Sequence, residues 1–349
     1  MWKILRSCTI GEQHVAAHRP CQDRYLVRQT DDRLILAVAD GHGGSFYCRS
    51  NVGARYACEA AVEILKDTTV PWELVPHRIK ALYDSKVEAH LLEKPLTADE
   101  LILVNGQLDQ VAYGSTLLTV CITPEGVFRA QVGDGAMHVV TTSGNFLENL
   151  PEDNNCVGFF TTSLVSPFAA DQFRWSFDPE TPAVALLYTD GYVSYKSHPW
   201  EILDLVKTLP DKIPHEVLAA GKRGDDQTVL AAIHSESVKT SAFLEGYAKA
   251  EAQSLLLERQ ANILEKIYTA DKAIKSYISK LAKCENIRIR NRLIEALCNR
   301  QQKFLELCDE YQTLEEQKTN AKDHAESPNG NHTITDITEN CDPNPESIG

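Results

Sequence analysis

The chain has 349 residues, of which 43% are hydrophobic and 24% are charged, and its formal net charge is −14. This length is enough for one large domain with an appendage or for two domains, and the composition is ordinary for a soluble globular protein. The acidic balance argues against non-specific binding of nucleic acid and against docking on an anionic membrane, because both require a basic face.

Cysteine usage and the start of the chain indicate the compartment. The ten cysteines show neither a CxxC pair nor the spacing of a zinc site. The opening residues, 1–6, are too few and too charged for a signal peptide, and no run approaches the roughly 18 apolar residues of a membrane span. We therefore expect reduced thiols in a cytoplasmic protein.

Residues 1–236 alternate strand-like apolar runs with stretches of helical periodicity. The run 34–39 predicts a buried strand, and apolar residues recur at helical spacing over 52–65. A second helix is predicted to begin near Pro76 and to carry an apolar face. Residues 117–132 read as two strands joined by a tight turn, which predicts a β-hairpin. Together these elements predict a sandwich of two sheets with helices outside.

The sequence changes in character at about residue 237. Apolar residues follow a 3-4 spacing over 267–284 and again, after a change of phase, over 287–311. This predicts one long helix with a stutter, or two helices folded back as a hairpin, within 237–320. The pattern leaves open whether this extension packs on the preceding domain or forms a coiled coil for self-association or partner binding through residues 240–318. The acidic, proline-containing segment 321–349 predicts a disordered tail. The apolar residues of the run 287–311, which the pattern predicts as contact positions between helices, are Ile287, Ile294, Leu297, Phe304, Cys308 and Tyr311.

Four aspartates lie at the ends of apolar strand-like runs. Asp40, Asp134 and Asp190 each follow such a run and precede a glycine, and Asp225 lies before another run. Carboxylates gathered at strand ends stay close together only if a cation offsets their repulsion, and hard oxygen ligands favour Mg²⁺, Mn²⁺ or Ca²⁺. The alternative is a set of ordinary turns, because Asp-Gly is a common turn sequence. Spacing alone does not decide between these two interpretations.

Five segments around these aspartates carry a recognisable pattern. They are Gly11-Glu12-Gln13-His14 with Cys21-Gln22-Asp23, Val38-Ala39-Asp40-Gly41-His42-Gly43-Gly44, Gly114-Ser115-Thr116 with Gln131-Val132-Gly133-Asp134-Gly135, Tyr188-Thr189-Asp190-Gly191, and Gly224-Asp225-Asp226-Gln227-Thr228-Val229. In this order they resemble the metal-dependent protein phosphatase family (PPM, the protein phosphatase 2C type), and a compact bacterial subgroup in particular. The resemblance covers residues 1–236. It implies an α+β fold, a four-layer α-β-β-α sandwich of two antiparallel sheets with flanking helices, before the long-helical C-terminal extension.

The resemblance implies a site built around two Mn²⁺ or Mg²⁺ ions. Asp40 would bridge the two ions, with the Gly41 carbonyl oxygen as a further ligand. Asp23 would act mainly by holding metal-bound water. Asp134 matches the position that helps to bind a third, weaker metal in the family. The implied metal set is Asp23, Asp40, Gly41, Asp134, Asp190 and Asp225.

His42 and Arg19 are the implied catalytic residues. His42 follows the metal loop and would protonate the leaving seryl or threonyl oxygen, while Arg19 would orient the phosphate through a bidentate contact. The family's phosphate arginine usually lies five residues before the first aspartate, where this chain has His18. Ser194 stands where many members carry a further acid. Gln22 replaces a common glutamate and would bind a metal water through its amide oxygen.

His14 and His18 offer a competing interpretation. Their i, i+4 spacing is that of a zinc pair on a helix. The resemblance places His14 in a loop or a strand instead, and the glutamate that zinc chemistry would need is absent. We therefore expect no zinc site at this pair.

The implied activity is that of a metal-dependent serine/threonine phosphoprotein phosphatase, which hydrolyses phosphomonoesters by in-line attack of a hydroxide that bridges two metals. The implied partners are phosphoserine and phosphothreonine proteins and a Ser/Thr kinase system, with no nucleic acid and no membrane. The alternatives are a catalytically inactive, phosphatase-like binding or scaffold module that acts through its helical extension, and a phosphatase for a small molecule. Inactive relatives typically lose metal aspartates, whereas Asp40, Asp190 and Asp225 are present here.

Overall fold

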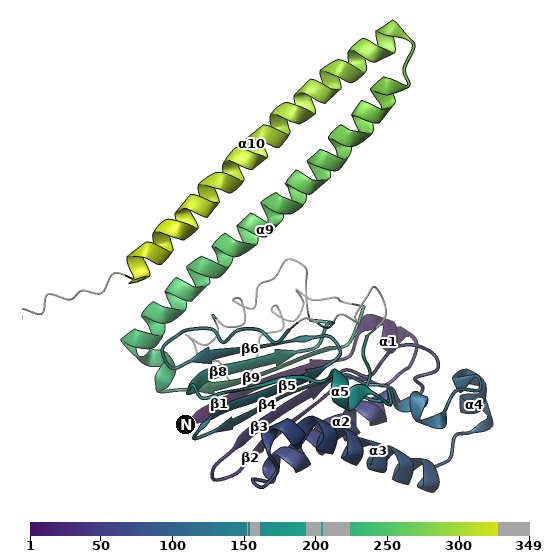
Figure 1. Cartoon of the computed structure of the whole chain (residues 1–349). Coiled ribbons are helices and arrows are strands. Elements are labelled where there is room, and N and C mark those ends of the chain that lie inside the picture. The colour runs from purple at the N-terminus through teal and green to yellow at the C-terminus, as the bar shows by residue number, and fades with distance from the viewer. Residues whose placement is uncertain (152, 154–160, 193–203, 205–223, 327–349) are drawn as a thin grey trace, which may run out of the picture. The chain divides into compact units, whose positions relative to one another are not determined.

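The computed structural model describes residues 1–151, 153, 161–192, 204 and 224–326. The chain divides into two compact units, Met1–Glu251 and Ala252–Gly349. The first unit holds two antiparallel β-sheets with helices, and the second is formed by two long helices (Figure 1). None of the helices in the described ranges combines the length and the apolar character that crossing a membrane would need.

Two sheets form the centre of the first unit, and every pair of neighbouring strands in them is antiparallel. The larger sheet has the order β2 (Arg24–Gln29), β3 (Leu34–Ala39), β4 (Leu117–Thr123), β5 (Gly126–Val132) and β7 (Arg174–Asp178). The smaller sheet has the order β1 (Trp2–Thr9), β9 (Gln227–His234), β8 (Pro182–Tyr188) and β6 (Ala136–Thr141). The expected hairpin over 117–132 is therefore confirmed as β4 and β5.

Successive residues of β3 serve two hydrophobic cores, because the side chains of a strand alternate between its faces. Leu36 and Val38 pack in the core between the two sheets. Ile35 and Ala37 pack in a second core, between the larger sheet and the helices that cover it. Since both faces are covered, the whole strand is apolar and buried. This explains why its sequence is a continuous apolar run.

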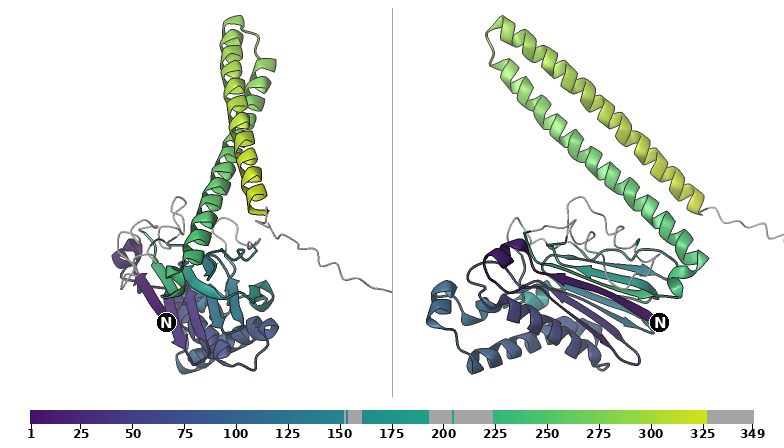
Figure 2. Two further views of the ribbon diagram at one scale, coloured as in Figure 1. Left: turned by 90° about the vertical axis from the view of Figure 1, so that its left-hand side faces the viewer. Right: turned by 180° about the vertical axis from the view of Figure 1, so that it is seen from behind.

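Two helices, α2 (Ser50–Lys66) and α3 (Val75–Glu93), cover the outer face of the larger sheet (Figures 1 and 2). Gly53 lets α2 pass close to the chain before β4, since a Cβ on this glycine would lie 1.8 Å from the carbonyl oxygen of Tyr113. Four alanines of α2 are completely buried and allow the helix to approach the sheet closely: Ala54, Ala57, Ala60 and Ala61. The shorter helices are α1 (Glu12–Ala16), η1 (Trp72–Leu74), α4 (Ala98–Val104), η2 (Asp109–Tyr113), α5 (Ala169–Gln172) and η3 (Ser237–Lys239).

The outer face of the smaller sheet is covered in part by residues beyond position 236. Val238 of η3 and Phe243 and Tyr247 of α9 (Ser241–Ala282) are buried in one core with β8 and β9. The first unit therefore continues past the change in composition at residue 237. Two antiparallel sheets with flanking helices, and a helical C-terminal region, confirm the expected fold class.

The second unit is a helical hairpin in which α9 is followed by α10 (Ile287–Glu326) after a four-residue connection (Figures 1 and 2). Of the two arrangements that the sequence predicts, the folded-back pair is confirmed. Ile287 and Ile294 were expected in the contact between the helices, but they are 74% and 44% exposed. The contact uses a neighbouring phase that includes Leu293, and α10 continues past residue 320, where the sequence predicts the tail to begin.

Candidate metal centre

Four acidic side chains meet at one end of the sandwich because of where their strands begin and end. Asp40 follows β3 directly, and Asp23 directly precedes the neighbouring antiparallel strand β2. In the other sheet Asp190 lies two residues after β8, and Asp225 lies two residues before the antiparallel β9. Both sheets therefore contribute carboxylates to the same end. The acids that the sequence pattern selects thus lie at one end of the two sheets.

Asp134 joins this end through a three-residue turn that crosses from β5 in the larger sheet to β6 in the smaller one. Its neighbours Gly133 and Gly135 have φ angles of +83° and +85°, which side chains with a Cβ rarely adopt. A Cβ on Gly133 would also lie 2.6 Å from a side-chain carbon of Thr116. The hydroxyl of Thr161 donates to Oδ2 of Asp134 at 2.6 Å. The Gly-Asp-Gly sequence is thus required by the crossing.

The loop that carries Asp40 is held by the residues just before β4. The backbone N–H of Thr116 donates to the Asp40 carbonyl oxygen at 2.8 Å, and the Asp40 N–H donates to Oγ1 of Thr116 at 3.0 Å. The N–H of His42 donates to the Gly114 carbonyl oxygen at 3.1 Å. A Cβ on Gly41 would lie 2.7 Å from a carbonyl oxygen at the start of α2. These contacts fix the backbone on both sides of the Asp40 side chain.

Burial and neighbouring charges raise the pKa values of the carboxylates at this end. Burial, the charges of Asp23, Asp190 and Asp134, and a hydrogen bond with Asp190 hold the pKa of Asp40 well above its usual range. Burial also raises the pKa of Asp23 to about 8, although its Oδ2 accepts a hydrogen bond from the Thr189 hydroxyl at 2.8 Å. Like charges this close in a desolvated site are unfavourable unless a proton or a cation is present.

The donor set suits a hard divalent cation. Oδ1 of Asp23 and Oε1 of Gln22 are buried and have no hydrogen-bond partner among the described residues. The Gln22 amide is oriented by its Nε2, which donates to the His42 carbonyl oxygen at 3.2 Å and to the Ser50 hydroxyl at 2.5 Å. In the described ranges no group of three or more His, Cys, Asp or Glu side chains is arranged so that it could hold a metal ion as it stands. The oxygens fit Mg²⁺ or Mn²⁺ chemically, and binding would require the carboxylates to adjust.

Asp225 and Asp226 are adjacent but differ in environment. The Asp226 carboxylate is buried, and it accepts hydrogen bonds from the backbone N–H groups of Gly11 at 2.7 Å and Gln22 at 2.5 Å. Asp225 lies at the surface, and partial desolvation and the charge of Asp190 raise its pKa. Asp226 is therefore a structural anchor, and Asp225 is the member of the pair that belongs to the carboxylate cluster.

His14 lies in the short helix α1, so the expectation of a loop or a strand at this position is wrong. Its Nδ1 atom lies 2.9 Å from Oδ2 of Asp226. This contact engages His14 with a buried carboxylate, not with His18 in a shared ion site. A one-and-a-half-turn helix without buried residues leaves no hydrophobic pattern by which the sequence could reveal it.

His42 is buried next to the cluster. Burial lowers its pKa to about 4, against the opposing effect of the Asp190 charge. Its ring packs against Tyr47 with centroids 4.7 Å apart, and its Nε2 has no hydrogen-bond partner among the described residues. The imidazole is therefore uncharged at neutral pH, which is unfavourable for the proton donation expected from the sequence.

Arg19 is exposed and lies beside the Asp40 loop. Its guanidinium Nη1 donates to the Gly43 carbonyl oxygen at 3.4 Å. With Gln22 and Tyr47 it lines a hollow of about 160 Å³. His18, the residue before it, has a φ of +52°, so the chain bends sharply there. At this bend Arg19 contacts the loop of the carboxylate cluster.

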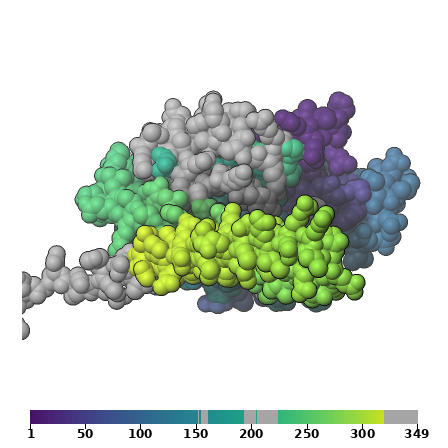
Figure 3. Space-filling view, turned by 90° about the horizontal axis from the view of Figure 1, so that it is seen from above, coloured from purple at the N-terminus to yellow at the C-terminus, as the bar shows by residue number. Residues whose placement is uncertain are grey.

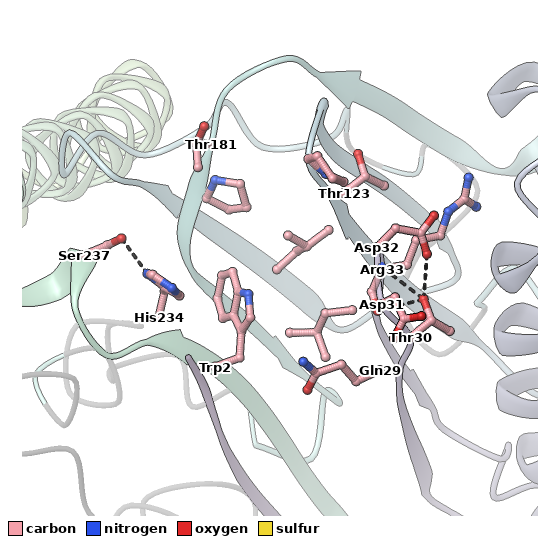
Figure 4. A pocket seen from close by; sticks show the side chains of 14 residues that line it. Trp2, Gln29, Thr30, Asp31, Asp32, Arg33, Thr123, Thr181, His234 and Ser237 are labelled. Atoms are coloured by element: carbon pink, nitrogen blue, oxygen red, sulfur yellow. Dashed lines mark hydrogen bonds between the residues drawn. The ribbon is translucent and has the colours of Figure 1, made fainter.

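A larger hollow of about 300 Å³ lies at the opposite end of the sandwich (Figure 4). There His234 interacts with the Ser237 hydroxyl at 2.7 Å and packs against Trp2 with ring centroids 5.3 Å apart. Thr30 donates to Asp32 at 2.9 Å on the facing wall. These polar groups are engaged with one another, and the aspartates of the cluster are not among the lining residues. The carboxylate end is therefore the better candidate site.

Several supporting residues were not identified from the sequence. Thr116 holds the Asp40 backbone, Thr189 holds Asp23, and Asp226 joins the chain before β2 to the start of β9. Hydroxyl residues beside the motif acids are a weak signal, because the contacts link residues that are far apart in sequence. Ser194 lies outside the described residues.

Comparisons with known proteins identify the family. The family model described as Protein phosphatase 2C matches residues 10–217. Serine/threonine-protein phosphatase 3 of Escherichia coli (strain K12) is 22% identical over 144 residues, which are 40% of this chain and 53% of that protein. The chain thus spans about half the length of this curated relative.

Solved structures of low sequence identity also resemble the chain. The Mycobacterium tuberculosis serine/threonine phosphatase PstP/Ppp is 17% identical, with 66% of this chain and 98% of that chain covered and a TM-score of 0.44. RsbX in complex with magnesium is 16% identical, with 66% and 94% covered and a TM-score of 0.41. Because the family model covers more than half of the sequence, and the motif aspartates gather at one end of the sandwich, this chain belongs to the protein phosphatase 2C family.

Proposed function

We propose that this protein is a metal-dependent phosphatase that hydrolyses phosphoserine and phosphothreonine in proteins. One observation supports this most strongly: burial and the charges of three other carboxylates raise the pKa of Asp40 at the end of the sandwich. A site that concentrates negative charge is poorly suited to bind a phosphate ester by itself. The same site becomes suitable once divalent cations offset that charge.

In this proposal Asp40 and the Gly41 carbonyl oxygen, with Asp190 and Asp225, would hold a pair of Mn²⁺ or Mg²⁺ ions. Asp23 would orient water at the site through its unpartnered Oδ1, and Asp134 would contribute to a weaker third position. When bound, such a pair lowers the pKa of a water molecule and offsets charge on the phosphoryl oxygens. The protein's own contribution is to hold the carboxylates at fixed strand ends.

Arg19 and His42 would act on the substrate. The Arg19 guanidinium, which is exposed beside the Gly43 carbonyl oxygen, would bind two phosphate oxygens. His42, with its lowered pKa, would act as a neutral imidazole that donates a hydrogen bond from Nε2 to the leaving oxygen. A neutral histidine can polarise an oxygen in this way without transferring its proton. The substrates would be phosphoproteins of a Ser/Thr kinase system.

Hydrolysis of p-nitrophenyl phosphate and of a phosphothreonine peptide by the purified full chain tests the proposal. We expect turnover with Mn²⁺ or Mg²⁺, none with EDTA, and a loss of at least a hundredfold in an Asp40→Asn variant, as for removal of a main electrostatic contributor. Hydrolysis of p-nitrophenyl phosphate, but not of the phosphothreonine peptide, would indicate a small-molecule phosphatase. Folded protein that binds the phosphopeptide but is inactive with both metals would indicate a binding module.

A further inference from the structure

The helical hairpin of the second unit carries apolar side chains on one exposed side. We propose that this side binds a second copy of the chain in antiparallel orientation, so that two hairpins form a four-helix bundle. The side, called the apolar stripe below, has exposed fractions from 44% to 74%. It consists of Leu257, Leu264, Tyr268 and Ile278 of α9 and Ile287, Ile294 and Leu305 of α10.

The contact between α9 and α10 follows the 3-4 spacing of a coiled coil. Gln260 and Ile263 of α9 and Leu314 of α10 are buried in it, with exposed fractions of 4%, 3% and 2%. Arg259 and Glu310, each one residue before a contact position, form an ion pair at 2.9 Å. This pair places the residues that precede contact positions on the same side of the hairpin, as antiparallel helices require.

Six of the seven members of the apolar stripe follow a partly or fully buried position by one residue, and the seventh, Ile287, opens α10 seven residues before Ile294. Leu257, Leu264 and Ile278 are spaced by multiples of seven on α9, as are Ile287 and Ile294 on α10. In an antiparallel pair these positions lie on one side of both helices, opposite the side of the Arg259–Glu310 ion pair. Asp271 and Lys275 share these positions and form an ion pair at 2.6 Å, so the stripe is interrupted between Tyr268 and Ile278. Elsewhere, a single helical pair would be expected to place polar residues where the stripe has apolar ones.

The opposite side of the hairpin is hollowed and mostly polar, with Leu255 as an exposed apolar exception. A groove of about 560 Å³ lies between the helices there. Asn262, Lys266 and Lys303 are among its lining residues, and each precedes a contact position by one residue. The two sides of the same hairpin therefore differ in chemistry. Figure 3 shows α10, in yellow to yellow-green, as a surface that runs the length of the hairpin.

Charge indicates which partner fits. The tip half of the hairpin, residues 266–303, has ten Lys or Arg and three Asp or Glu. The base half, residues 252–265 and 304–318, has two Lys or Arg and seven Asp or Glu. In an antiparallel pair of hairpins the basic tip of each copy lies on the acidic base of the other, so both ends attract. A parallel pair would place like charges together.

A second copy fits these features better than a polyanion does. The stripe continues onto the acidic base through Leu257 and Leu264, and a nucleic acid or an anionic membrane would be repelled there. A two-fold dimer uses the same surface on both copies, so one self-complementary stripe is sufficient. The resulting bundle would cover apolar positions on both helices.

Light scattering of the full chain during size-exclusion chromatography tests the proposal. We expect a mass of twice 38.9 kDa for the wild type and 38.9 kDa for Leu264→Lys and Ile294→Lys. Leu255→Lys and Ile289→Lys are the matched controls, because these residues are 45% and 53% exposed and lie outside the stripe. Both controls should remain dimeric. High salt should weaken the dimer because it screens the attraction between tip and base.

Orientation is tested by carbodiimide cross-linking of a mixture of isotope-labelled and unlabelled copies. Links between copies should join residues 266–303 of one to residues 304–318 of the other. Tip-to-tip links would overturn the antiparallel arrangement. A wild type that stays monomeric at high concentration, or a dimer that survives both stripe substitutions, would overturn the proposal. The proposal would also be overturned if the protein were a monomer and Leu264→Lys destabilised its first unit. In that case the stripe would be covered by another part of the same chain.

Discussion

Asp226 donates its backbone N–H to Oδ1 of Asp225 at 2.9 Å, yet the two neighbouring carboxylates serve different parts of the structure. The Asp226 carboxylate accepts from the backbone N–H groups of Gly11 and Gln22 and lies 2.9 Å from the His14 ring. It therefore ties the segment before β2 to the start of β9. The Asp225 carboxylate lies near Asp190, whose charge contributes to its raised pKa.

This difference predicts opposite outcomes for two conservative substitutions. Asp226→Asn replaces a charged acceptor of two buried N–H groups, so we expect the free energy of unfolding to fall by about 2–3 kcal/mol. Asp225→Asn should leave it nearly unchanged in EDTA but should weaken metal-dependent turnover. Urea unfolding with EDTA and phosphatase assays with Mn²⁺ measure the two effects. Equal losses of stability would show that both acids are structural.

Removing the Asp40 carboxylate, whose pKa is held well above its usual range, should stabilise the protein in the absence of divalent ions. Asp40 is surrounded by Asp23, Asp190 and Asp134, so Asp40→Asn removes repulsion while keeping the shape of the side chain. Its thermal midpoint in EDTA should lie above that of the wild type. Mn²⁺ at a hundred times its dissociation constant should stabilise the wild type by about 2.7 kcal/mol and the variant much less. A variant that is less stable in EDTA, or that responds fully to Mn²⁺, would contradict the cluster as a cation site.

The raised pKa of Asp23 predicts a pH dependence of folding. The folded protein holds this proton up to about pH 8, whereas the unfolded chain releases it near pH 4. Stability from the bound proton is therefore complete at low pH and is lost as the pH rises between these values, by at most about 1.4 kcal/mol per pH unit. In EDTA, Asp23→Asn should flatten this decline between about pH 5 and about pH 8. If the unfolding free energies of wild type and variant changed in parallel across that pH range, the decline would not come from the raised pKa of Asp23.

The ion pair of Arg49 and Glu100 should contribute more to stability than a surface pair does. Arg49 precedes α2 and contacts both carboxylate oxygens of Glu100 in α4 at 2.7 and 2.8 Å, and this lowers the pKa of Glu100 to about 2. We expect Glu100→Gln to lower the free energy of unfolding by about 1–2 kcal/mol. The control is Glu59, which pairs at the surface with Arg55 at 3.8 Å and with Lys86 at 3.6 Å, and Glu59→Gln should change stability by less than about 1 kcal/mol. Similar effects of the two substitutions would show that the Arg49–Glu100 pair contributes no more to the free energy of unfolding than a surface pair does.

The parts of the fold that the sequence predicts are those specified by local patterns. The buried run of β3, the helical spacing of α2 and the hairpin over 117–132 each depend on neighbouring residues, and each is confirmed. The short helix α1 buries no residue and so leaves no hydrophobic pattern. The phase of α10, which leaves Ile294 exposed, depends on how one long helix packs on another.

The candidate site divides in a similar way. Motif acids such as Asp40 and Asp190 could be identified because glycine and an apolar run mark the strand end in the sequence. The separate role of Asp226 could not, because its hydrogen bonds reach residues more than 200 positions away. The lowered pKa of His42 also arises from tertiary burial. Local sequence thus marks the acids at the strand ends, and tertiary packing decides what each of them contacts.

Arg19 offers a test of substrate binding that is separate from metal binding. It stands one residue after the usual phosphate-arginine position, yet the bend at His18 leaves its guanidinium beside the Gly43 carbonyl oxygen. Arg19→Ala would remove charge-assisted hydrogen bonds to the phosphate, which are worth about 1.5–3 kcal/mol. We therefore expect kcat/KM for a phosphopeptide to fall by roughly ten- to a hundredfold. The Mn²⁺-induced rise in thermal midpoint should not change, since Arg19 touches no acid of the cluster in the described contacts. His18→Ala is the matched control and should retain activity. If His18→Ala loses the activity and Arg19→Ala keeps it, the phosphate is bound at the family's usual position and the bend has no part in catalysis.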